Sequence, residues 1–154
     1  MAAVEFNSFE TFKQKKDAPL PKGKWVTVTR EMVNAFAEAT HDHQWIHTDP
    51  ERARQESFFG MAVAHGFLSL SLVPGMIRDV VESSSKKIEV NYGLNRVRFP
   101  APVPVGSRVR LSCRIGEVKE MENSGLKVTW HCEVEIENND KPVCVCELIV
   151  LMFE

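Results

Sequence analysis

Three of the five histidines of this 154-residue chain fall within residues 41–47, a segment that also contains Asp42. A carboxylate and an imidazole that lie close together can hold a water molecule and remove its proton. A further histidine, in the pair His65-Gly66, opens the longest apolar helical segment of the chain. Backbone N–H groups at the start of a helix can stabilise a developing oxyanion, aided by the helix dipole. The two segments together predict an acid–base pair that faces an oxyanion site.

Each of these residues also has a purely structural explanation. Asp42 could only cap a turn, His47 could be a polar core residue, and Gly66 could serve a turn that needs a permissive backbone. The histidines and Asp42 could also offer ligands to zinc. A metal is disfavoured because such ligands usually lie on a helix or recruit a distant ligand, whereas this segment is expected to be a loop. We therefore expect neither a metal nor a cofactor.

Helix signals lie on both sides of this histidine-rich segment. Thr29 is suited to cap a helix that runs to about Ala39. Asp49 followed by Pro50 is typical of a second helix N-terminus. The polar stretch between these helices, residues 40–48, is expected to be a loop.

One long helix is predicted from His65 to about Glu82. It is apolar nearly all round, Phe67 included, which indicates a buried helix. Pro74 within it predicts a kink or the loss of one backbone hydrogen bond.

From residue 86 onward the hydrophobic period changes to two, which is typical of strands. The last strand is apolar on both faces and is expected to be central, and a turn is expected at residues 138–141. The predicted strands are Lys86–Tyr92, Leu94–Phe99, Arg108–Val118, Leu126–Glu137 and Val143–Phe153.

Helices followed by long antiparallel strands predict an α+β fold. Because one very apolar helix must be covered by the sheet, we expect the hot-dog arrangement, in which an antiparallel sheet wraps around one long buried helix. The length fits a single domain, residues 1–154, on which residues 1–24 pack as an N-terminal extension.

The composition excludes several classes of protein. Lys and Arg number 19 and Asp and Glu number 21, so the net charge of −2 argues against a nucleic-acid partner. No apolar run approaches the roughly 18 residues that a membrane span needs. The start of the chain carries charges early, which disfavours a secretory signal and makes the cytoplasm the expected location. None of the four cysteines forms a C-x-x-C pair, and all are expected to be buried apolar residues.

The pattern Phe36-Ala37-x2-Thr40-x-Asp42-x4-His47, followed by His65-Gly66, resembles the MaoC-like dehydratases, the (R)-specific enoyl-CoA hydratases. Residues 42–53 and 91–103 resemble the NodN-like subgroup of that family. The similarity covers roughly residues 25–153.

This resemblance implies a hot-dog homodimer that interconverts a trans-2-enoyl thioester and an (R)-3-hydroxyacyl thioester, carried on CoA or on acyl-carrier protein. It implies that Asp42 and His47 activate the water and that the Gly66 amide polarises the thioester carbonyl. His65 is expected to fix the loop before the helix, with contact to the thioester as the alternative. Trp45 is expected to form a wall of the substrate pocket or of an interface.

Other residues leave the substrate and the reaction open. Arg96, Arg98 and Lys86 are candidates for the carrier phosphates by charge alone. The chain departs from the family at His41, where glycine is usual, and near Pro74, where the hydratases carry a hydrogen-bonding serine; Ser69 and Ser71 are possible substitutes. A hot-dog thioesterase and a non-catalytic acyl-thioester binding or interaction module are the alternatives, although the Asp42/His47 spacing favours a hydratase.

Overall fold

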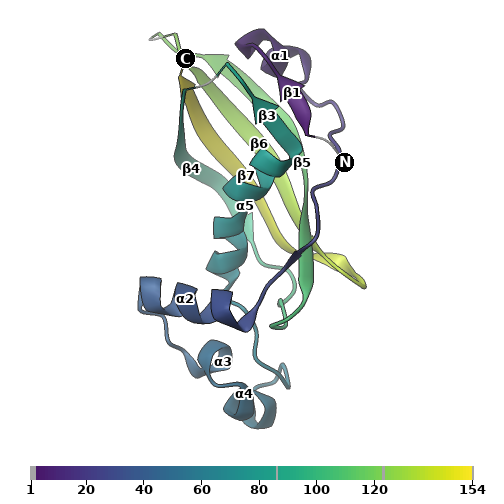
Figure 1. The fold of residues 1–154 in the computed structure, drawn as a ribbon, viewed down its shortest axis with the longest axis vertical. Helices are drawn as coiled ribbons and strands as arrows, with labels where there is room; N and C mark the ends of the chain where they lie inside the picture. The colour runs from purple at the N-terminus through teal and green to yellow at the C-terminus, as the bar shows by residue number, and fades with distance from the viewer. Residues whose placement is uncertain (1–2, 86, 123, 154) are drawn as a thin grey trace.

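The computed structural model describes residues 3–85, 87–122 and 124–153. Its largest element is a five-stranded sheet in the order β2-β5-β6-β7-β4, in which every neighbouring pair is antiparallel (Figure 1). The strands are β2 (Val26–Thr27), β4 (Ile88–Arg98), β5 (Arg108–Glu120), β6 (Leu126–Ile136) and β7 (Asn139–Phe153).

Helix α5 (Gly66–Val80) lies across the concave side of this sheet and contacts β5, β6 and β7 (Figure 1). Leu68, Val73 and Met76 on its inner face belong to the hydrophobic core. The helix is continuous through Pro74. The expected α+β hot-dog arrangement is therefore confirmed.

The alternation of apolar and polar residues in β6 explains how the core is filled. Trp130, Cys132 and Val134 point inward and are almost completely buried. Cys132 lies directly across from Cys113 on β5 and Cys146 on β7. All four cysteines are buried free thiols, as expected from the sequence.

One face of α5 contradicts the expectation of a helix buried all round. Phe67 is 67% exposed, and Ser71 and Gly75 on the same side are also exposed. The sheet covers only the opposite side of the helix. Part of the apolar surface of α5 therefore stays exposed in this fold.

The strand region predicted from residue 86 to residue 99 also differs from the expectation. The two predicted strands at 86–99 are one strand, β4, with register shifts that leave Tyr92 and Asn95 as bulges. The predicted start, Lys86, lies outside the described residues. β7 is interior, as predicted, so the edge of the sheet is β4. Its exposed apolar side chains, the β4 patch, are Ile88, Val90, Tyr92 and Leu94, which are 40–61% exposed.

The turn between β6 and β7 is tighter than predicted. Only Glu137 and Asn138 connect the strands, and Asn138 has a φ of 63°. Asparagine tolerates this left-handed conformation, which two-residue hairpin turns require.

Three helices form a separate layer beyond one end of the sheet: α2 (Arg30–Thr40), α3 (Trp45–Thr48) and α4 (Pro50–Glu56) (Figure 1). Thr29 and Asp49 cap α2 and α4 as predicted, by accepting the N–H groups of Met32 and Arg52. The loop predicted at 40–48 is wrong in part, because Gln44 O accepts two N–H groups and closes the single turn of α3.

The N-terminal residues pack along the other end of the sheet. β1 (Val4–Phe6) pairs with β3 (Val81–Ser83), and α1 (Phe9–Gln14) follows it. Phe6 and Phe12 are fully buried in the core. None of the helices within the described ranges has the length and apolar character needed to span a membrane.

Candidate active site

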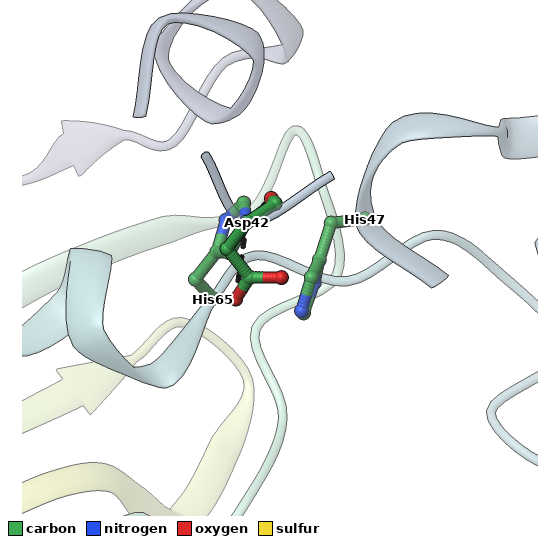
Figure 2. Close-up of side chains that lie close together, drawn as sticks. All are labelled: Asp42, His47 and His65. Carbon is green, nitrogen blue, oxygen red and sulfur yellow. Dashed lines mark hydrogen bonds and ion pairs between the residues drawn. The ribbon is translucent and has the colours of Figure 1, made fainter. Parts of the chain in front are cut away.

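Asp42, His47 and His65 come together at the N-terminal end of α5 (Figure 2). Asp42 lies in the turn after α2, His47 on α3, and His65 at the cap of α5. One nitrogen or oxygen atom of each side chain lies within 4.8 Å of the others. Both histidines are buried, whereas the Asp42 side chain is 54% exposed. A molecule arriving from solvent therefore meets the carboxylate first.

The His47 ring is fixed by the backbone of the segment that leads to α5. Its Nδ1 lies 2.6 Å from the Val63 carbonyl oxygen. Because a carbonyl only accepts, Nδ1 carries the hydrogen and the neutral ring has its lone pair on Nε2. Burial, as the largest cause, lowers the pKa of His47, and neighbouring His65 lowers it further. His47 is therefore neutral near pH 7 and is a potential base through Nε2.

His65 holds both of the other members in place. Its Nε2 donates to the Asp42 carbonyl oxygen at 2.9 Å. Its ring stacks on that of His47, with centroids 3.9 Å apart and an interplanar angle of 26°, and Phe36 lies at 5.0 Å. His65 thus fixes the backbone of Asp42 and the plane of the His47 ring.

The spacing of Asp42 and His47 suits a water molecule. Two hydrogen bonds of about 2.8 Å that meet at one water oxygen can join acceptors separated by the distances found here. Such a water would donate one hydrogen to the carboxylate and one to Nε2, and it would keep a lone pair for attack. The pair can therefore activate water as a general base.

The same three residues fit a metal ion poorly. The lone pair of an imidazole nitrogen lies in the ring plane, and two rings stacked 3.9 Å apart direct their lone pairs side by side. An ion at about 2.0–2.1 Å from both rings would lie out of at least one ring plane. The other ring nitrogen of His65, Nδ1, is buried and has no hydrogen-bond partner among the described residues.

Gly66 provides the second half of the site. Within the described part of the chain, its N–H and that of Phe67 donate to no other group. Gly66 is not among the residues with positive φ, so the permissive-backbone explanation is wrong. A Cβ at this position would instead lie 2.9 Å from the Phe99 ring. Glycine is needed here because Phe99 packs against the backbone.

The remaining predicted site residues lie away from this cluster. Trp45 is half-buried on α3, with the Arg52 guanidinium 4.4 Å over its ring. Arg96 and Arg98 alternate with Val97, which packs on the core, so they point from the opposite face of the sheet. Lys86 lies outside the described residues.

The two arginines line a cavity of about 750 Å³ on that face. Its wall also contains Glu133, Glu147 and Pro100. Pro100 directly follows Phe99, whose ring meets Gly66. The cavity therefore reaches the residue that follows Phe99 in the chain.

The departures from the family have a local explanation. His41 caps α2 with a φ of 59°, a left-handed conformation in which glycine is favoured. Ser71 lies on the exposed face of α5 and donates to Phe67 O, whereas Ser69 is buried on the core side. Of the two serines, only Ser71 lies on the open side of the helix.

Sequence analysis missed three contacts that hold the site. Val63 O binds His47, the Phe99 ring covers Gly66, and the Arg30 guanidinium donates to His47 O. The first and last involve backbone carbonyls, which carry no sequence signal. The close approach of Phe99 was signalled only by the glycine itself.

A sheet wrapped around one helix, with an Asp–His pair at the start of that helix, defines a hot-dog protein equipped for water chemistry. Residues 11–135 match the model of the MaoC like domain. The 3-hydroxyacyl-thioester dehydratase Z of Mycobacterium tuberculosis (strain H37Rv) is 51% identical over 126 residues, which cover 82% of this chain and 83% of that protein. The chain therefore belongs to the MaoC-like dehydratase family, a family of hydro-lyases.

Two further comparisons agree with this assignment. Nodulation protein N of Rhizobium leguminosarum bv. viciae is 43% identical over 134 residues, 86% of this chain and 83% of that protein. Among solved structures, a monoamine oxidase regulatory protein from Archaeoglobus is similar with a TM-score of 0.77 and 28% identity, covering 99% of this chain and 97% of that one. The NodN-like character expected from residues 42–53 is thus confirmed.

The state of His47 predicts how stability depends on pH. Because burial lowers the pKa of His47 in the folded chain, the unfolded chain binds the proton more readily. The resulting loss of folding stability is absent above the ordinary histidine pKa of about 6.5. As pH falls from that value through the folded pKa, the wild type should lose stability relative to His47→Gln. Urea unfolding of both proteins between pH 8 and pH 5 measures the difference. Equal pH dependence of the two proteins would show that His47 is not held neutral by burial.

Proposed function

We propose that this protein catalyses the reversible hydration of a trans-2-enoyl thioester to an (R)-3-hydroxyacyl thioester. The observation that carries the proposal is the Asp42 carboxylate within 4.8 Å of a ring nitrogen of His47, at the end of α5 where the N–H groups of Gly66 and Phe67 are unpaired among the described residues. The similarity to a 3-hydroxyacyl-thioester dehydratase supports the same reaction class.

In the proposed reaction, the water oxygen held by Asp42 and His47 bonds to the β-carbon of the enoyl group. The double-bond electrons shift toward the thioester carbonyl, whose oxygen becomes negative and is stabilised by the Gly66 N–H. The proton taken from water by the Asp42/His47 pair returns to the α-carbon. The sum is one water added across the double bond, with no net change in the protein.

A thioesterase would use the same water at the carbonyl carbon, and a binding module would not react at all. Crotonyl-CoA distinguishes the three, because hydration removes the enoyl-thioester absorbance without releasing thiol. Release of free thiol would instead indicate a thioesterase. If neither the absorbance nor the free thiol changes with crotonyl-CoA or with longer enoyl-CoA homologues, the binding module is the remaining function.

The handedness of the product tests the face of attack. If water approaches from the Asp42/His47 side, the product is the (R) isomer, and an (S)-specific 3-hydroxyacyl-CoA dehydrogenase coupled to the reaction should produce no NADH. Steady NADH production would contradict the proposed face.

Removing either half of the pair should slow turnover strongly. General acid–base catalysis is typically worth about 10²–10⁴-fold, so Asp42→Asn and His47→Gln should each lower kcat on crotonyl-CoA within that range. The double variant should lose less than the product of the two effects, because both groups act on one water. His43→Gln is the control, since His43 is an exposed residue of the same loop whose ring faces Glu38. Wild-type turnover by Asp42→Asn would remove Asp42 from the mechanism.

We further propose that the protein is a homodimer formed through edge strand β4. The β4 patch lies on an edge strand, which offers unpaired backbone groups to a second copy, and Phe67, next to Gly66 in sequence, is a further exposed apolar side chain. Neither of the two cavities described here is lined by Asp42 or His47. A second copy would supply the missing wall of the site.

A charge in the β4 patch should break this dimer. Val90→Glu would bury a carboxylate at the interface and should convert the protein to a monomer of lower activity, measured by light scattering at micromolar concentration. Lys119→Glu, on strand β5 and exposed, should remain dimeric. A wild-type protein that is monomeric with full activity would contradict the proposal.

We also propose that Arg96 and Arg98 bind a phosphate of the thioester carrier. The two guanidinium groups line the cavity that extends toward Phe99, and neither has a carboxylate partner among the residues the structure describes. The carrier would thus lie on the far face of the sheet while its acyl group reaches Gly66.

The Arg96→Ala/Arg98→Ala variant should raise KM for crotonyl-CoA about 10-fold or more, since charge-assisted bonds to phosphate are lost. With the crotonyl thioester of N-acetylcysteamine, which has no phosphate, wild type and variant should show the same KM. An equal change with both substrates would mean that the arginines do not contact the carrier.

We propose a cytoplasmic location as well. Its support is the state of the cysteines, all four of which are free thiols, as in proteins of reducing compartments.

A further inference from the structure

Arg30, the first residue of α2, contacts the backbone of a residue far from it in sequence. Its guanidinium donates to the carbonyl oxygen of His47, across the junction between α2 and α3. Arg30 is partly buried, and within the described residues it pairs with no carboxylate. A partly buried cation that bonds a neutral carbonyl gives up some of its hydration without gaining an opposite charge.

Other arginines of the chain show the ordinary alternative. Five of them form ion pairs with a carboxylate, in the pairs Arg52–Glu56, Arg54–Glu51, Arg108–Glu137, Arg110–Glu135 and Arg114–Asp17. Arg98 also donates to a carbonyl, but to that of its own neighbour Val97. Arg30 has Glu31 next to it in sequence and does not pair with it. Its side chain is instead committed to the backbone of His47.

Helix α3 explains why that carbonyl needs a partner. A single turn such as Trp45–Thr48 is far below the length at which a helix is stable by itself. The last four carbonyls of any helix lack intrahelical partners, and a cation at this end also favours the helix dipole. Arg30 satisfies the His47 carbonyl and ties the turn to the longer, capped helix α2.

We propose that Arg30 is a positioning residue that holds His47 in its reactive orientation. His47 is then fixed at two points: its ring through Nδ1 to Val63 O, and its backbone through Arg30. Without Arg30 the turn is free to shift, the stack on His65 loosens, and Nε2 leaves its place beside Asp42. This role deepens the proposed function and rests on it.

The test compares Arg30→Ala with Arg30→Lys, which keeps a cationic donor. A small displacement of a reacting group can cost about 10²-fold, so Arg30→Ala should lower kcat on crotonyl-CoA by roughly 10- to 100-fold with little change in KM. Arg30→Lys should recover part of the loss. Arg54→Ala is the matched control, because Arg54 is an exposed arginine of neighbouring α4 that pairs with Glu51. Its kcat should equal that of the wild type.

A second readout does not depend on activity. Burial lowers the pKa of His47, so a loosened α3 admits water and should move the NMR titration midpoint of its imidazole up toward 6.5 in Arg30→Ala, but not in Arg54→Ala. A residue that only stabilised the fold would lower Tm without this shift. If Arg30→Ala does not fold, Arg30→Gln, which keeps a shorter donor, replaces it.

An unchanged kcat together with an unchanged His47 titration would overturn the positioning role. If the wild type hydrates no enoyl thioester, the proposed function fails, but the His47 titration still decides the role of Arg30. A shift of the titration would then support the contact with His47, and the absence of a shift would contradict it.

Discussion

The stack of two buried imidazoles, His47 on His65 at 3.9 Å, is the interaction on which the site depends. Each ring is tied to a backbone carbonyl through one nitrogen, so its tautomer is fixed by the fold. A proton on His47 would place a charge in a buried position beside a second imidazole, which is why burial and His65 both lower the pKa of His47. The result is a neutral base, beside a carboxylate that remains in water.

The fold delivers the parts of this stack from three directions. His65 comes with the helix that the sheet encloses, His47 with a single turn that needs support, and Asp42 with the end of α2. Close packing of Phe99 on Gly66 brings the end of β4 against the start of α5. The Asp42/His47 pair and the unpaired N–H groups of Gly66 and Phe67 therefore lie at the same end of α5, where Phe67 is exposed.

Local signals in the sequence predicted the elements that depend on local chemistry. Thr29 and Asp49 cap helices because a side-chain oxygen meets an N–H two or three residues away, and β6 alternates because one face is wet. Predictions failed where distant packing decides the outcome. The single turn of α3 is bonded by Arg30 of α2, β4 continues through its bulges, and Phe67 is exposed because the sheet covers only the opposite side of α5. Spacing and resemblance grouped Asp42, His47, His65 and Gly66, but the carbonyls that orient the two rings leave no mark in the sequence.

The central claim is that Asp42 and His47 add water to, and remove it from, the β-carbon of an acyl thioester. Exchange of oxygen in isotopically labelled water tests this most directly. With (R)-3-hydroxybutyryl-CoA and the wild-type protein, reversible dehydration should place labelled oxygen in the 3-hydroxyl group, as measured by mass spectrometry, while the thioester remains intact. Label found only in a released carboxylate, or no label in the 3-hydroxyl group, would contradict the account.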